Sequence, residues 1–309
     1  MSATIDAPAI MGNDTNPPVR GYKKRPLKLP RVILHSFLTL IALAWFAPLG
    51  WAVYTSVRPY AETARKGYVS WPDALTLKNY RDAFTEGRLL HFFWNTALIV
   101  VPALLLTLFV SSMAAFVLSR FNFRGAIPIL LLLTAGNLLP HQVIITPLFH
   151  IFRLIPLPTF LNVDGTLLNS YWAVLLVYVA SQTGFCTFVL ANFMRMIPDE
   201  MMEAAVVDGA SAWRQYFSIV LPLCRPALAA LGTLEFTWMY NDFFWALVLM
   251  VSGDKRPITS ALDNLKGTFF TDNNLIAAGS VLVAVPTILV YIFLQKQFVA
   301  GLTVGATKG

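Results

Sequence analysis

Charged residues are scarce in this sequence. Only 13% of its 309 residues are Asp, Glu, Lys or Arg, whereas 57% are hydrophobic and the mean hydropathy is +0.63. Soluble domains contain about 25% charged residues, so the composition excludes an ordinary water-soluble domain. The formal charge of +7 does not indicate a nucleic-acid partner, because basic residues that flank apolar runs are typical of membrane topology.

The sequence also lacks the short motifs that hold phosphates, metals or nucleophiles. It has no G-x-x-x-x-G-K-[ST] loop (the nearest stretch is 305–308, at the C-terminus), no H-E-x-x-H and no G-x-S-x-G. Its four histidines show no metal-ligand spacing. We therefore expect no catalytic residue, no metal site and no cofactor in this chain, and we do not expect an enzyme.

Cysteine is nearly absent. Cys186 and Cys224 lie in or beside apolar segments and far apart in the sequence. This placement favours two buried free thiols over a disulfide or a metal site.

Long apolar runs dominate what is present, and each is long enough to cross a bilayer. They lie at about 32–56, 91–118, 126–152, 169–194, 225–251 and 275–298. Pro102 predicts a kink in the second run, and Gly136, Pro140 and Pro147 interrupt the third. We predict an all-α integral membrane protein, with six transmembrane helices in residues 32–309.

The polar segment 1–31 indicates how the helices are oriented. It is rich in proline and we predict a disordered cytoplasmic tail. Six basic residues precede the first apolar run: Arg20, Lys23, Lys24, Arg25, Lys28 and Arg31. Such a cluster places the N-terminus in the cytoplasm, so six spans place the C-terminus there too. Segments 57–90, 153–168 and 252–274 would then lie outside.

A polar stretch interrupts the apolar pattern at 197–222, IPDEMMEAAVVDGASAWRQYFSIVLP. Pro198 suits a helix start, and Gly209 permits the left-handed turn that ends such a helix. Ser211 can cap a second helix, and Pro222 can end the unit. Met202, Ala205 and Val206 share one face of the first helix, with Glu203 directed away from it. On spacing alone, the stretch is equally a connector between two membrane helices.

Four stretches resemble one family. Glu203-Ala204-Ala205, Gly209 and 219–222 (IVLP) match the E-A-A, three residues, G, nine residues, I-x-L-P pattern in the EAA loop of ABC-importer permeases. The stretch 238–245 is similar to the W-N-x-[FY]-x-x-P-L segment of carbohydrate importer permeases, with Met-Tyr inserted after the tryptophan and Ala246 where proline is usual. The end, 297–309, is similar to the tail of maltose-type permeases. With NYRDAF at 79–84, the resemblance covers about 32–309.

The resemblance implies a permease subunit of an ATP-driven, binding-protein-dependent sugar importer in the bacterial cell (inner) membrane. Its implied partners are a second homologous permease, two cytoplasmic ATPase subunits that bind ATP and Mg, and an extracytoplasmic sugar-binding protein. The loop between helices 4 and 5 would couple the chain to the ATPase through Glu203, Ala204, Ala205, Asp208, Gly209, Leu221 and Pro222. The last outer loop would reach the binding protein, with Thr259, Asp263 and Asn264 as candidates.

Polar and aromatic residues in the fifth predicted helix suggest a substrate path. Glu235 and Asp242 are seven residues apart and so share roughly one face. Our candidates are Trp238, Tyr240, Asn241 and Asp242, joined by His141 and Gln142 after Pro140. Aromatic rings stack on sugar faces, and amides and carboxylates take hydroxyls. The same residues equally fit an interhelical polar clamp with an interfacial aromatic belt.

Two other functions stay open at this point. A secondary transporter driven by an ion gradient usually has repeated halves and broken helices; the third helix is broken, but the halves do not repeat. A membrane scaffold that transports nothing is the other. ATP dependence of uptake separates the first alternative from an ATP-driven importer, and uptake of any substrate excludes the second.

Overall fold

The computed structural model describes residues 29–121, 123–265 and 271–303, and within these ranges it contains helices and no strand. The chain divides into two units, 1–49 and 50–309. Helix α1 (Leu29–Ser56) crosses the boundary between them. It begins at Leu29, so residues 29–31 are helical, whereas the sequence placed them in the tail.

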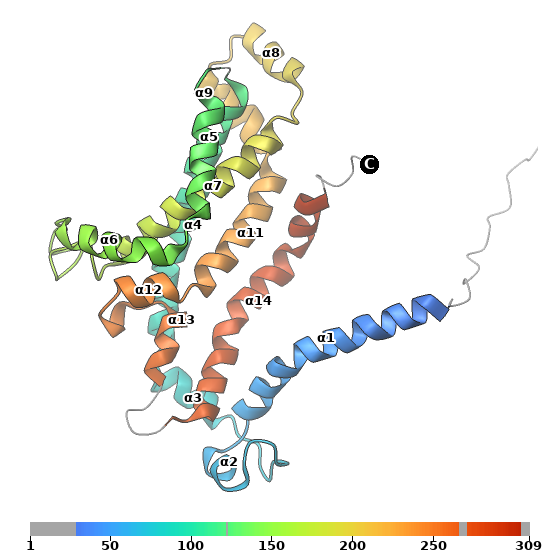
Figure 1. The fold of residues 1–309 in the computed structure, drawn as a ribbon, viewed down its shortest axis with the longest axis vertical. Helices are drawn as coiled ribbons and strands as arrows, with labels where there is room; N and C mark the ends of the chain where they lie inside the picture. The colour runs from blue at the N-terminus through green and yellow to red at the C-terminus, as the bar shows by residue number, and fades with distance from the viewer. Residues whose placement is uncertain (1–28, 122, 266–270, 304–309) are drawn as a thin grey trace, which may run out of the picture. The chain divides into compact units, whose positions relative to one another are not determined.

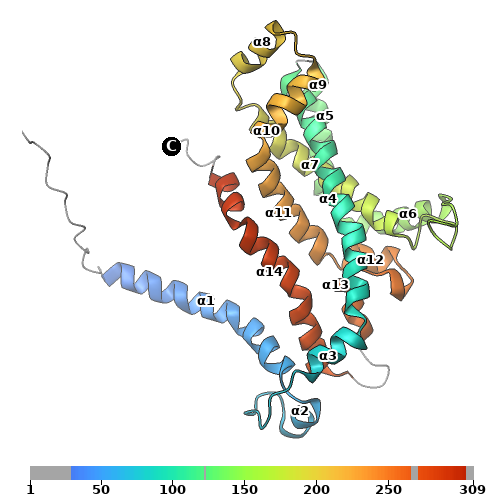
Figure 2. The same ribbon diagram turned by 180° about the vertical axis from the view of Figure 1, so that it is seen from behind.

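Four long helices organise the second unit: α4 (Leu89–Arg120), α7 (Tyr171–Met194), α11 (Arg225–Asn241) and α14 (Asn273–Thr303). Helix α4 packs along α7, and α11 packs along α14 (Figures 1 and 2). Pro102 lies inside the continuous α4. Both cysteines are buried and free, as predicted. Helices α1, α4 and α7 and residues Asn273–Gln295 of α14 are long and apolar enough to cross a membrane.

The third predicted span is bent. Helix α5 (Ala126–Ala135) continues into the 3-10 turn η1 (Gly136–Leu138), and α6 (His141–Leu154) follows at 100° to this pair. Leu139 is extended, which is the conformation favoured before a proline, and Pro140 then starts the new helix. Pro147 lies inside α6 and does not interrupt it, contrary to our expectation.

The fifth predicted span, 225–251, is wrong as a single helix. Helix α11 ends at Asn241, Asp242 is extended, and α12 (Phe244–Leu249) follows. A second bend, of 71°, precedes α11. Before that bend lie α9 (Ala212–Gln215), the π-helical turn η2 (Tyr216–Val220) and α10 (Leu221–Leu223). Counting each bent pair as one span, the described residues contain up to six candidate spans.

Helices α2 (Tyr60–Lys66) and α3 (Lys78–Thr85) lie at the end of the bundle opposite α8 (Asp199–Val207) and α9 (Figure 1). Three short helices follow α12 in the chain: η3 (Gly253–Lys255), α13 (Ile258–Ala261) and η4 (Leu262–Leu265). We predicted 252–274 as a long outer loop. Within it, Ile258, Ser260 and Ala261 are buried against helices that include α3, α4 and α14. The apolar side chains of α13 complete the core at this end, so this part of the segment cannot act as a free loop.

A buried ion pair fixes the chain just after α1. Arg58 donates to Glu62 Oε1 at 3.0 Å, and both side chains are almost fully buried. Glu62 also accepts the backbone N–H of Asp73 at 2.9 Å. Asn274, at the start of α14, donates to the carbonyls of Thr55 and Arg58 at 3.0 Å each. These bonds tie the end of α1 to α14.

We expect the buried Arg58–Glu62 ion pair and its hydrogen bonds to make the stability of the protein sensitive to acid. Hydrogen bonds from the Asp73 backbone N–H and from Arg58 hold the pKa of Glu62 below its ordinary value. A lowered folded-state pKa stabilises the fold above the ordinary pKa of the carboxyl, and this contribution is lost as pH falls through the folded value. The thermal midpoint of purified protein should therefore fall as pH drops below about 4.3.

The Glu62→Gln variant should flatten this dependence on pH. Asp254→Asn is the control, because Asp254 pairs with Arg88 on an exposed surface, where ion pairs contribute little. An unchanged acid slope in Glu62→Gln contradicts the prediction.

Candidate functional site

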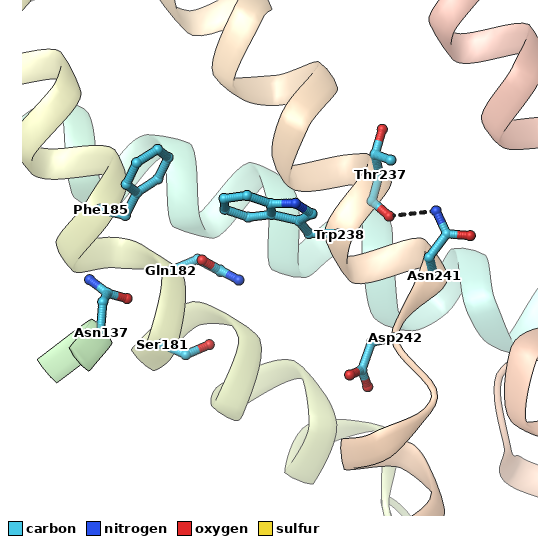
Figure 3. Close-up of a pocket in the computed structure, with 8 residues that line it drawn as sticks. All are labelled: Asn137, Ser181, Gln182, Phe185, Thr237, Trp238, Asn241 and Asp242. Atoms are coloured by element: carbon cyan, nitrogen blue, oxygen red, sulfur yellow. Dashed lines mark hydrogen bonds between the residues drawn. The ribbon is translucent and has the colours of Figure 1, made fainter. Parts of the chain in front are cut away.

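A cavity of about 510 Å³ opens on the bundle between η1, α7 and α11. Its lining residues are Asn137, Ser181, Gln182, Phe185, Thr237, Trp238, Asn241 and Asp242 (Figure 3). One wall is aromatic: the rings of Phe185 and Trp238 lie 5.6 Å apart at 49°. Trp238 is 46% exposed, so its ring is available to a ligand.

The helix break positions Asp242. Its Oδ2 accepts the Tyr178 hydroxyl of α7 at 2.9 Å and the backbone N–H of Trp245 at 3.1 Å. Its backbone carbonyl accepts the Thr259 hydroxyl of α13 at 2.7 Å. An aspartate readily bonds to nearby backbone N–H groups and so competes with helix continuation. The break therefore turns the carboxylate into the cavity.

Helices α5 and α7 approach closely beside this cavity. A Cβ on Gly184 would overlap the backbone carbonyl of Leu133 and lie 2.9 Å from Asn137 Nδ2. With its amide turned to suit both partners, Asn137 donates to the Ser181 carbonyl at 2.5 Å and accepts from the Phe185 N–H at 3.1 Å. Because Gly184 has no side chain, Asn137 can reach the backbone of α7 at Ser181 and Phe185.

The second notable feature is α8 (Asp199–Val207), which projects beyond the end of the bundle (Figure 1). Arg120, at the end of α4, anchors its start by donating to Asp199 Oδ1 at 2.8 Å and to the Ile197 carbonyl at 2.9 Å. Pro198 and Ser211 occupy the N-cap positions of α8 and α9, as predicted.

Gly209 ends α8 in the left-handed conformation, with φ +73°. The Ala210 N–H bonds the Ala205 carbonyl at 2.9 Å, and the Gly209 N–H bonds the Val206 carbonyl at 3.0 Å. These two bonds form a Schellman motif. The motif sets the angle between α8 and α9.

Helix α8 leaves small apolar residues uncovered beside an exposed glutamate. Glu203 and Ala204 are exposed, Val206 is 61% exposed and Val207 is 86% exposed, whereas Ala205 is buried. Val206 therefore does not share a buried face with Ala205. Single exposed apolar residues are normal, but a group of small ones on a projecting helix is typical of a docking surface.

Residues 107–304 match the family model described as "Binding-protein-dependent transport system inner membrane component". The chain belongs to this family. It is a multi-pass inner-membrane permease, a transport component and not an enzyme.

Named relatives agree with this membership. The permease is 33% identical to the arabinooligosaccharides transport system permease protein AraQ of Halalkalibacterium halodurans, over 89% of this chain and 97% of that protein. It is 31% identical to the diacetylchitobiose uptake system permease protein NgcG of Streptomyces coelicolor, over 89% of this chain and 88% of that one. Its fold resembles that of a bacterial ABC transporter involved in the import of the acidic polysaccharide alginate, with TM-score 0.73 and 21% identity over 86% of this chain and 95% of the other.

The structure of the permease brings together only some of the predicted path residues. Trp238, Asn241 and Asp242 line the cavity. Tyr240 does not: it is buried, stacks on Phe236 and donates to the Val283 carbonyl of α14 at 2.8 Å. Gln142 is exposed at the start of α6 and is not among the lining residues. The side chain of His141 lies outside the described residues.

The other predicted residues are more dispersed. Glu235 is fully buried and accepts from Cys186 Sγ at 3.2 Å, away from the cavity.

The predicted coupling residues do not all lie together. Asp208 is exposed at the end of α8, but Leu221 and Pro222 lie in α10, where Leu221 packs into the bundle core. Pro222 does not end the unit, because the helix continues to Leu223. Asp263 is exposed, and the side chain of Asn264 lies outside the described residues.

Sequence reasoning missed five of the lining residues: Asn137, Ser181, Gln182, Phe185 and Thr237. Residues 181–183, Ser-Gln-Thr, form a polar turn within an otherwise apolar helix. Polar residues inside a membrane helix usually face the bundle interior or a cavity, so this turn was the available signal.

Tyr240→Phe should destabilise the permease without weakening cargo binding. It removes the bond to the Val283 carbonyl, and one net hydrogen bond contributes about 1 kcal/mol. The measurement is the thermal midpoint together with the apparent KM for uptake. Trp238→Phe is the comparison, since it leaves the core intact and should raise KM. A KM raised more by Tyr240→Phe than by Trp238→Phe contradicts this assignment.

Proposed function

We propose that the chain is one of two permease subunits of an ATP-driven sugar importer. The family match over 107–304 carries this proposal. The open polar and aromatic cavity supports a path for cargo, and the projecting α8 supports a contact with a motor subunit. In this proposal a polar N-terminal segment, predicted as 1–31, precedes the transmembrane domain, and α1 is the first helix of that domain.

Helix α8 is the proposed contact with the ATPase. Two ATPase subunits bind ATP and Mg, and α8 of each permease docks into one of them. Its exposed Ala204, Val206 and Val207 let another surface approach closely, and the exposed Glu203 meets a basic group there. Removing one partner of a buried charge pair at an interface costs about 2–5 kcal/mol, so Glu203→Ala should weaken docking.

The second permease covers the cavity. The cavity is open on this chain, and the Trp238 ring and several amides and hydroxyls in its wall are left without a covering element in the described part of the chain. A homologous subunit placed against it would enclose a path between the two chains. Trp238 and Phe185 then stack on a sugar ring, and Gln182, Asn241 and Asp242 take its hydroxyls.

The binding protein docks at the opposite end of the bundle from α8, near α2 and α3 (Figure 2). Our earlier candidate Thr259 is a weaker one for this contact, because its hydroxyl bonds to Asp242. Asp263 and Asn264 remain candidates for the contact with the binding protein. Relatives carry arabinooligosaccharides or diacetylchitobiose by name, so the proposed cargo is an oligosaccharide.

Both termini and α8 lie in the cytoplasm in this proposal. Reporter fusions after Gly125, Gly209 and Gly309 should give cytoplasmic activity, and fusions after Gly165 and Gly253 should give extracytoplasmic activity. The physical basis is the basic cluster before α1. A cytoplasmic signal at Gly165 or Gly253 contradicts the topology.

Reconstituted vesicles test the function. The chain is co-expressed with its partner permease, ATPase and binding protein, and uptake of labelled oligosaccharides is measured. Uptake should require ATP and the binding protein, and it should survive ionophores that collapse proton and sodium gradients. Uptake that ignores ATP and stops with ionophores would instead establish a secondary transporter, and no uptake of any cargo would leave only a scaffold.

A further inference from the structure

Asp242 is the only ionisable residue among the described residues that line the cavity. The other lining residues are amides, hydroxyls and aromatic rings. None of the ion pairs among the described residues involves Asp242. Among the lining residues that the structure describes, the cavity therefore presents one carboxylate and no cationic side chain.

The contacts of Asp242 suit the charged form. Asp242 Oδ2 accepts hydrogen bonds from the Tyr178 hydroxyl and the Trp245 N–H, and an ionised carboxylate can only accept. Neither partner carries a positive charge. The donors fix the carboxylate in place but leave its negative charge uncompensated toward the cavity.

A negative charge on the cargo would be repelled here. Two like charges about 6 Å apart, at an effective dielectric constant of about 20, change a binding equilibrium about 100-fold. Water in the open cavity weakens this, so we expect about tenfold or more. Hydroxyls suffer no such penalty, because they donate to a carboxylate.

Building on the proposed sugar path, we propose that this cavity accepts neutral oligosaccharides and rejects those that carry carboxylates, and that Asp242 sets this selection. Similarity to known proteins does not decide whether the cargo is neutral or acidic, since their names include arabinooligosaccharides and an acidic polysaccharide. Trp238 supplies the apolar surface for a ring, and Gln182 supplies a neutral amide for its hydroxyls.

The test uses matched sugars that differ only in charge. The probes are gluco-, galacto- and mannotrioses, each beside its form oxidised to a carboxylate at C6. Binding to the complete permease–ATPase complex in lipid nanodiscs is measured without the binding protein, so that the binding protein's own selectivity does not enter. Wild type should bind the best neutral triose about tenfold or more tightly than its oxidised form.

Asp242→Asn should reduce this ratio to about threefold or less, because the amide keeps an acceptor oxygen for Tyr178 and loses the charge. Gln182→Glu adds a second carboxylate and should widen the ratio, which keeps the test valid if the first variant does not assemble. Thr237→Val, an uncharged change in the same wall, should leave the ratio unchanged.

Two results would overturn the selection alone: equal binding of the neutral and oxidised sugars by wild type, or a binding ratio that neither charge variant changes. Absence of binding and of ATP-driven uptake for every sugar overturns the sugar path and this inference with it.

Discussion

Gly209→Val should reduce ATP-driven uptake at least tenfold while leaving the protein inserted in the membrane. Gly209 has φ +73°, and a Cβ there would meet no atom within 4 Å, so the substitution has room but is strained by its backbone. The left-handed conformation costs an ordinary residue about 1–2 kcal/mol. Relief of that strain breaks the Schellman bonds at Ala210 and Gly209 and changes the direction of α8.

Because α8 touches the motor in our proposal, a misdirected α8 should lower co-purification of the ATPase and reduce uptake at least tenfold. Gly209→Asn is the matched control, since asparagine tolerates left-handed backbone better than other residues. Gly165→Val repeats the strain elsewhere, at φ +66° and also with no atom within 4 Å. It should leave ATPase binding intact. Wild-type uptake by Gly209→Val would reduce the 197–222 stretch to a connector.

The turn at Gly209 was predictable because its determinants are local. A glycine that follows a short amphipathic helix, with a serine cap after it, specifies the same geometry in any fold. The long helices α4 and α7 were predictable for a similar reason: an unbroken apolar run in a membrane has to satisfy its backbone internally. The family pattern at Glu203–Gly209 was also recognisable, because it is defined by residue types at fixed spacing and needs no knowledge of the fold.

The cavity was only half predictable, because its walls come from three separate elements. Trp238, Asn241 and Asp242 are neighbours in sequence and were found together. Asn137 reaches the cavity only because α5 bends at η1 and packs on Gly184. Tyr240 faces α14 instead of the cavity, and helical spacing near the break at Asp242 did not say which residue faces which.

The same tight packing gives the second large effect. Replacing a helix glycine with alanine normally stabilises by about 0.5–1 kcal/mol. At Gly184 the sign should reverse, because the new methyl group overlaps the Leu133 backbone carbonyl, and backbone cannot swing aside as a side chain can. Overpacking of this kind costs about 1–3 kcal/mol. We expect Gly184→Ala to lower the thermal midpoint.

Gly184→Ala should also lower the rate of uptake by the protein that remains folded. Separating α5 from α7 withdraws Asn137 from the Ser181 carbonyl and opens the wall of the cavity. Gly232→Ala in α11 is the matched control: its methyl group would meet Leu108 Cδ1 at 3.5 Å, an ordinary van der Waals contact. It should raise the midpoint slightly and leave uptake unchanged. Midpoints that shift in the same direction in both variants would mean that α5 does not rest on Gly184, and the cavity would then need another wall.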